Sequence, residues 1–107
     1  MIEVRRFVTA SGVDVVGQWL ADLNDERARA KINIRIARMA AGNFGDCKSV
    51  GKGIFELRID YGPGYRLYFA RIGHAIVLLL CGGDKRRQSA DIHRAAMFLE
   101  NHQKRNS

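Results

Sequence analysis

The hydrophobic period of this chain changes near Gly45, and that change constrains the fold more than any other feature. Before it, apolar residues recur at helical spacing over 13–23 and again from Asp25 to Ala41. Asn24-Asp25 separates the two stretches and supplies a helix cap, so they predict two helices joined as a hairpin. After Gly45 the apolar residues alternate with polar ones, as in half-buried strands.

Two of these alternating stretches, 54–61 and 65–70, predict a β-hairpin around Gly62-Pro63-Gly64. A three-residue loop would set Tyr61 opposite Tyr65. Asp60 would then face Arg66, and Arg58 would face Tyr68. In this register the polar face collects one cluster, whose members are Glu56, Arg58, Asp60, Arg66 and Tyr68.

The remaining elements complete an α+β pattern. A short first strand is expected within 2–8, and one more short strand near 46–50. The continuous apolar run 75–81 predicts a strand buried on both faces, inside the sheet. A last helix is expected over 89–102, followed by a frayed tail. Residues 1–107 therefore predict a single domain with an N-terminal helical hairpin packed on a mostly antiparallel sheet, and a C-terminal helix.

Charge narrows the class of partner. The chain has 107 residues, with 18 Lys and Arg against 11 Asp and Glu, a net charge of +7. Such a balance favours a polyanion such as RNA or DNA, or an acidic protein, although it also serves solubility alone. We expect neither a membrane span nor an export signal. Cys47 and Cys81 form no Cys-x-x-Cys pair, so no metal site or cofactor is expected, and the cytoplasm is the expected location.

The polar face of the hairpin is the candidate site. Arg58 and Arg66 offer planar, permanently charged groups that suit a phosphodiester, and Glu56 could act as a general base. The alternative is a solvated outer face with cross-strand ion pairs. Lys85-Arg86-Arg87 follows the buried strand, where sites often have rigid support. His93 lies early in the last helix and could act as an acid or base.

Three segments of the chain resemble the RelE/ParE toxin superfamily, in particular its HigB-like addiction module killer branch. They are 53–58 (GIFELR), 62–69 (GPGYRLYF) and 78–85 (LLLCGGDK), followed by Gln88 and Asp91-Ile92. The resemblance implies a compact microbial-ribonuclease type of fold with a curved sheet. It also implies the toxin of a type II toxin–antitoxin system, bound by a cognate antitoxin that is often a helix-turn-helix repressor.

The resemblance further implies a choice between two activities. RelE-like and HigB-like members cut mRNA on the ribosome without a metal, whereas ParE-like members inhibit DNA gyrase and lack nuclease chemistry. By position, Arg66 matches the arginine that contacts the scissile phosphate, Arg58 a basic residue of the preceding strand, and Lys85 and Arg86 the basic pair after the last strand. Glu56 falls where the best-known cutter has a lysine proposed as base.

The expected function is thus a metal-independent, ribosome-dependent mRNA endoribonuclease, with ParE-like gyrase inhibition as the alternative. Arg58 and Arg66 would stabilise charge on the phosphate, and Glu56 would be the candidate base. Lys85 or His93 would protonate the leaving oxygen. The expected RNA-binding residues are Lys48, Lys52, Tyr68, Arg86 and Arg87.

Overall fold

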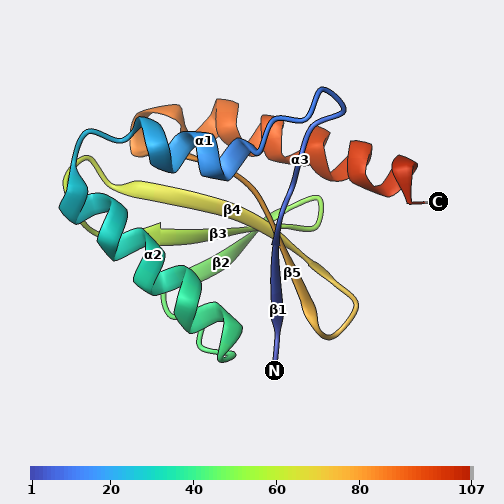
Figure 1. Ribbon diagram of the computed structural model, residues 1–107, viewed down its shortest axis with the longest axis horizontal. Helices are drawn as coiled ribbons and strands as arrows, with labels where there is room; N and C mark the ends of the chain where they lie inside the picture. The colour runs from blue at the N-terminus through green and yellow to red at the C-terminus, as the bar shows by residue number, and fades with distance from the viewer. Residues whose placement is uncertain (107) are drawn as a thin grey trace.

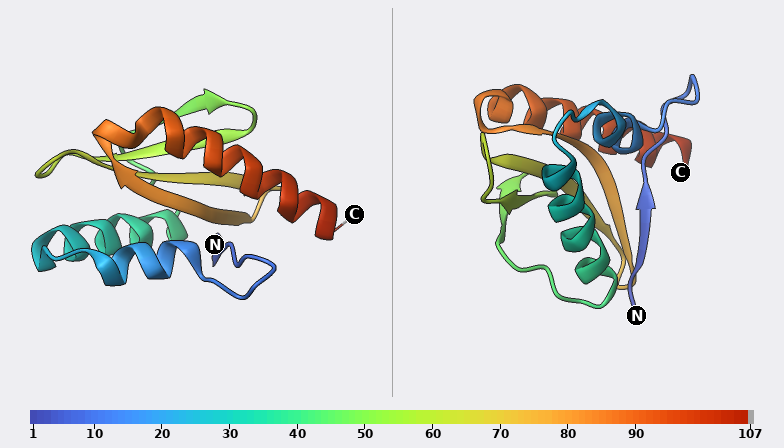
Figure 2. Two further views of the ribbon diagram at one scale, coloured as in Figure 1. Left: turned by 90° about the horizontal axis from the view of Figure 1, so that it is seen from above. Right: turned by 60° about the vertical axis from the view of Figure 1, so that its left-hand side comes forward.

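The computed structural model describes residues 1–106 as three helices on the two faces of a five-stranded sheet (Figure 1). The elements, in chain order, are β1 (Glu3–Arg6), α1 (Val15–Asp22), α2 (Glu26–Ala40), β2 (Cys47–Gly51), β3 (Ile54–Ile59), β4 (Tyr65–Ile72), β5 (Ile76–Asp84), a 3-10 turn (Lys85–Arg87) and α3 (Gln88–Arg105). The α1–α2 hairpin lies on one face and α3 on the other, as the view from above shows (Figure 2).

The sheet is mixed, with strand order β1-β5-β4-β3-β2. β1 pairs parallel to β5, whereas the other neighbours are antiparallel. The α+β class is therefore confirmed, and so is the short strand near 46–50, which is the edge strand β2. The apolar run 75–81 lies inside the sheet as expected, because β5 has a neighbour on each side.

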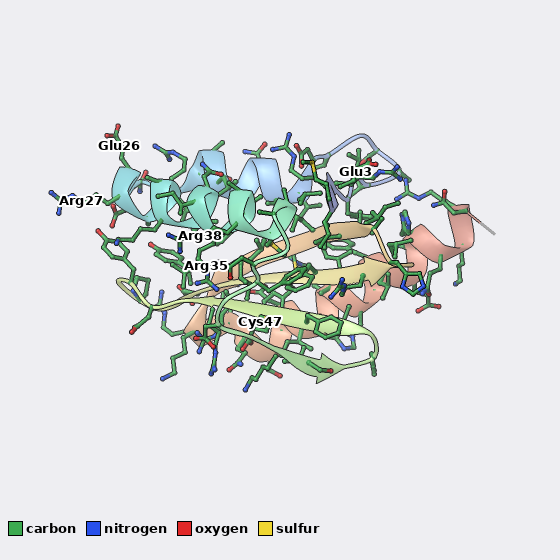
Figure 3. The ribbon with its side chains drawn as sticks, turned by 90° about the horizontal axis from the view of Figure 1, so that it is seen from below. Glu3, Glu26, Arg27, Arg35, Arg38 and Cys47 are labelled. Carbon is green, nitrogen blue, oxygen red and sulfur yellow. The ribbon has the colours of Figure 1, made fainter. Side chains whose placement is uncertain are left out.

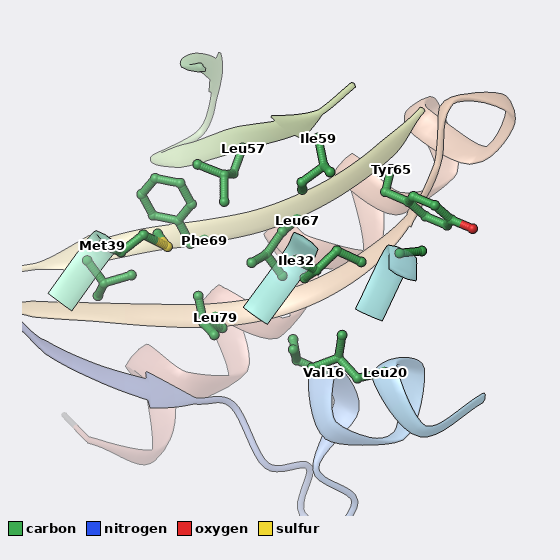
Figure 4. Packing of buried hydrophobic residues seen from close by; sticks show 12 residues of the cluster. Val16, Leu20, Ile32, Met39, Leu57, Ile59, Tyr65, Leu67, Phe69 and Leu79 are labelled. Atoms are coloured by element: carbon green, nitrogen blue, oxygen red, sulfur yellow. The ribbon is translucent and has the colours of Figure 1, made fainter. Parts of the chain in front are cut away.

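The first core lies between the sheet and the helical hairpin (Figure 4). Asp14 and Asp25 cap α1 and α2 by accepting backbone N–H bonds, so both helices begin where the sequence places a capping side chain. Ala28, Ile32 and Met39 are the buried face of α2. Opposite them, the sheet contributes every second residue of β3 and β4, including Leu57 and Leu67.

Arg35 ties this hairpin to the sheet. Its guanidinium donates to the carbonyl oxygens of Arg58 at 2.6 Å, Phe44 at 3.1 Å and Asp46 at 3.3 Å. Figure 3 shows the side chain between α2 and the strands, whereas Arg27 points away from them. The loop that carries Asp46 is therefore fixed beside β3.

The second core lies between the sheet and α3, and a bulge in β5 shapes it. Tyr68 pairs with Cys81 but Phe69 pairs with Leu79, so Leu80 is an extra residue. Leu80 and Cys81 both pack in the core on the α3 side. The strand shows no alternation in its sequence because both of its faces are buried, with Val77 and Leu79 in the first core and Leu78 and Leu80 in the second.

The hairpin register differs from the predicted one by two residues. Ile59, not Tyr61, lies opposite Tyr65, so the loop holds the five residues 60–64. Arg58 consequently faces Arg66 rather than Tyr68, and Asp60 is outside the ladder. The predicted division into two faces is still correct, because a shift of two residues keeps each side chain on its face. Gly62 and Gly64 both have positive φ, which lets the longer loop close.

One further difference concerns the C-terminal helix. The predicted fraying from 103 is wrong, because α3 continues to Arg105, whose guanidinium donates to the Val8 carbonyl at 2.8 Å. Within residues 1–106, none of the helices combines the length and the apolar character that crossing a bilayer requires.

Candidate functional site

Arg58 on β3 and Arg66 on β4 lie directly opposite each other on the face of the sheet that α3 covers. Like charges in this position repel, so each needs a compensating anion. Asp46 pairs with Arg58 at 2.9 Å, and Glu56 faces the Nε atom of Arg66 at 3.7 Å. Among the residues that the structure describes, no hydrogen bond reaches Nη1 of Arg58 or either Nη group of Arg66. These N–H groups of Arg58 and Arg66 can therefore donate hydrogen bonds to a bound anion.

Glu56 is fully buried beneath the start of α3. Its Oε2 atom accepts from Gln88 Nε2 at 2.7 Å and from the Tyr68 hydroxyl at 3.2 Å. Burial, followed by the charge of Glu56, raises the pKa of Tyr68, so the phenol stays protonated as a donor. The carboxylate therefore acts within the protein, where it holds Arg66 and Tyr68 in place.

A second buried carboxylate, Asp91, lies in the next turn of α3. It faces Arg87 at 3.7 Å and Arg94 at 4.0 Å. Burial raises the pKa of Asp91, and these two arginines oppose the shift. The carboxylate packs so closely on Gly83 that a Cβ there would stand 1.9 Å from Oδ2.

These buried and half-buried groups form a polar seam, a term we use for Glu56, Arg66, Tyr68, Gln88, Asp91 and Arg94. The buried side-chain N and O atoms found without a hydrogen-bond partner in residues 1–106 belong to four of them: Glu56, Arg66, Asp91 and Arg94. Buried polar atoms are normally bonded, so each exception needs an explanation. The first two turns of α3 thus rest on charged groups, whereas the following turns pack through Ala95 and Leu99.

Two lysines complete the charge around the arginines. A Cβ at Gly64 would stand 3.5 Å from Lys85 Cβ and 3.9 Å from Arg66 Nη1, which places these side chains beside each other. Lys48 lies directly opposite Glu56 on the edge strand β2 and is exposed. Four cations, Lys48, Arg58, Arg66 and Lys85, thus accompany two carboxylates, Asp46 and Glu56. A surplus of positive charge remains, which suits a phosphodiester.

The alternative of a solvated outer face is wrong, because α3 covers Glu56 and Tyr68 and leaves Arg66 with a 12% exposed side chain. Tyr68, predicted to bind RNA, has no exposed surface. Arg58, with a 37% exposed side chain, lies at the open margin of the face. The structure therefore brings Arg58, Arg66 and Lys85 together above a buried layer, with Lys48 on the neighbouring edge strand.

Other predicted residues lie elsewhere. Arg86 pairs with Asp84 at 3.2 Å and is largely exposed. Arg87 lines a cavity of about 530 Å³ between α1 and α3. His93 and Lys52 line a different cavity, on the outer side of α3. The predicted proximity of His93 to the arginines is therefore not found, because Gln88 and Asp91, not His93, are on the face of α3 that meets the site.

Sequence reasoning missed Asp46, Gln88, Asp91 and Arg94. Asp46 lies in an irregular loop, and its pairing with Arg58 depends on the anchor that Arg35 provides. The other three lie in or near the first turns of α3. Ile92, Ala95 and Leu99 recur at helical spacing and mark the buried side of the last helix. Asp91 lies directly before Ile92, and this position was the signal in the sequence that its carboxylate is buried.

The Gly82-Gly83 pair also has an explanation that sequence reasoning did not provide. A Cβ at Gly82 would stand 2.4 Å from the ring of Trp19, and one at Gly83 would meet Asp91. The two glycines thus admit a helix side chain on each face of β5. Trp19 is partly buried and packs against the first core.

No group of three or more His, Cys, Asp or Glu that could hold a metal ion is found within 1–106.

The chain is 55% identical over 82 residues to a protein of Haemophilus influenzae that is described as uncharacterized. The match covers 77% of this chain and 83% of that protein. No model of a known protein family matches the chain. At this identity and coverage, the chain belongs to the same family as the Haemophilus influenzae protein.

Proposed function

We propose that this protein is the toxin of a type II toxin–antitoxin pair, with a RelE-like fold, and that it cuts mRNA on the ribosome. The observation that carries the proposal is the directly opposed pair Arg58 and Arg66, with Lys85 beside it. Two guanidinium groups on rigid strands match the non-bridging oxygens of one phosphate group.

The nucleophile of the reaction comes from the RNA itself. The ribose 2′-oxygen attacks the adjacent phosphorus, the bond from phosphorus to the 5′-oxygen breaks, and a 2′,3′-cyclic phosphate remains. Arg58 and Arg66 stabilise the negative charge that grows on the phosphate oxygens, the largest contribution in sites of this kind. Lys85 supplies the proton that the departing 5′-oxygen takes up.

The proton acceptor is the point at which we revise the expected roles. Glu56 has no exposed surface, and its Oε2 already accepts two hydrogen bonds. Asp46 has a 54% exposed side chain and pairs with Arg58 through Oδ1, which leaves Oδ2 open. We therefore assign the 2′-hydroxyl proton to Asp46 and the orientation of Arg66 to Glu56. His93 has no part in the proton transfer.

The experiment is induction of the protein in growing cells, with RNA 5′ ends mapped and plasmid supercoiling measured in the same cultures. We expect new 5′ ends within translated mRNA and unchanged supercoiling. Intact mRNA together with relaxed or broken DNA would contradict the proposal and support ParE-like gyrase inhibition. Growth at full induction without any partner protein would contradict both activities.

A further inference from the structure

A second group of polar residues lies outside the arginine pair, in a groove between the β2–β3 turn and α3. The groove encloses about 410 Å³ and is lined by Lys52 from the turn and by His93, Met97, Glu100 and Gln103 from the helix. The turn abuts the helix, because a Cβ at Gly53 would stand 3.5 Å from Leu99 Cδ2. The proposed chemistry leaves these residues unused.

Lys52 occupies a backbone conformation that lysine does not favour. Its φ is +57°, and it stands between Gly51 at +92° and Gly53 at +78°. A two-residue hairpin turn with positive φ at both positions selects Asn, Asp or Gly. A lysine at the first of these positions weakens the turn. We therefore look for a role of the Lys52 side chain that offsets this cost.

The groove continues the basic face of the proposed active site. Lys48, opposite Glu56, lies on β2 between the arginine pair and the turn. On α3, His93 lies about 8 Å along the helix axis beyond Gln88, which binds Glu56. A strand of RNA held at the arginine pair would reach the groove within a few nucleotides.

The lining favours a phosphate over a base. Lys52, His93 and Gln103 supply donors, and the negative charge of Glu100 is matched by Lys104 at 3.1 Å. Among residues 1–106, no aromatic ring other than the imidazole lines the groove, so a base finds no stacking platform there.

We propose that Lys52 and His93 form a second phosphate-binding site, which holds the backbone of single-stranded RNA a few nucleotides from the arginine pair. This inference rests on the proposed function and assigns His93 to binding. Contacts to the backbone carry no sequence information, so the site binds RNA of any sequence.

The test is binding of a fluorescent 12-nucleotide 2′-O-methyl RNA, which cannot be cleaved, by the full chain. Loss of one phosphate contact lowers the slope of log K against log salt by about 0.7, or about fivefold in affinity at 0.1 M salt. We expect this loss in Lys52→Asn, together with a higher Tm, because Asn suits the turn. His93→Ala should also weaken binding. Arg5→Gln, which removes an exposed charge at the opposite edge of the sheet, is the matched control.

Wild-type affinity and slope in a folded Lys52→Asn protein would overturn the inference, even if the wild-type protein cuts mRNA. A variant that keeps its affinity for RNA but no longer binds a glutamate-rich peptide would also overturn it, because the groove would then serve an acidic protein. Equal losses in Lys52→Asn and Arg5→Gln would show that net charge, not a site, is measured. Absence of cleavage by a wild-type protein that binds RNA through Lys52 would instead count against the proposed chemistry.

Discussion

Replacing Glu56 by Gln removes one negative charge from the polar seam while keeping the volume of the side chain. Glu56 is fully buried, and Arg66 retains only a 12% exposed side chain, so solvent compensates little for the loss. Hydrogen bonds to a charged group contribute about 1.5–3 kcal/mol, and breaking a buried ion pair costs about 3–5 kcal/mol. Because the ion pair spans 3.7 Å and the amide keeps one acceptor oxygen, we expect a loss of about 2–3 kcal/mol in the free energy of unfolding.

Urea unfolding at pH 7, followed by circular dichroism, measures this loss. Glu100→Gln is the control, because it breaks an exposed i,i+4 pair with Lys104 that contributes about 0.3–0.5 kcal/mol. In the double variant Glu56→Gln/Arg66→Gln, part of the loss should be recovered, since no unpaired charge stays buried. If Glu56→Gln lowers the free energy of unfolding no more than Glu100→Gln does, the charge of Glu56 does not stabilise the polar seam, and our account of Arg66 is wrong.

Two further predictions concern β5. Gly82→Ala would place a Cβ 2.4 Å from the Trp19 ring, so we expect a loss of about 1–3 kcal/mol and a red-shifted tryptophan emission; unchanged emission would contradict the packing. Burial raises the pKa of the Cys81 thiol to about 11, so its contribution to stability is present below about pH 8.5 and is lost as pH rises towards 11. A thiol reagent at pH 8 should modify half-buried Cys47 first, and equal rates for both thiols in the native state would refute this.

The sequence predicted the elements well because each depends on local patterns. Asp25 precedes a helical stripe, and alternation marks β3 and β4, so the types and faces of these elements follow from capping and period. The hairpin register could not be obtained in this way. Loops of three and five residues keep the same faces, and the choice depends on how Tyr65 and Ile59 pack against the helical hairpin.

The candidate site was predicted only in part, for a related reason. Alternation placed Glu56, Arg58, Arg66 and Tyr68 on one face but could not say what covers that face. Only the position of α3 shows that Glu56 is buried and that Gln88 binds it. Asp46 and Arg58 meet through a loop with no periodic signal, so tertiary structure alone brings them together.

The most direct test of the central claim is the chemistry of RNA ends produced on purified ribosomes. We expect the wild-type protein to cut bound mRNA and to leave a 2′,3′-cyclic phosphate on the upstream fragment. Arg66→Ala leaves the buried Glu56 carboxylate without its ion-pair partner and should lose stability, although Gln88 and Tyr68 still donate hydrogen bonds to that carboxylate. The folded Arg66→Ala protein should cut about 10²–10³-fold more slowly. Arg5→Gln should cut at the wild-type rate. Intact mRNA with the wild-type protein, or undiminished cutting by a folded Arg66→Ala variant, would contradict the claim that the opposed arginines are the active site.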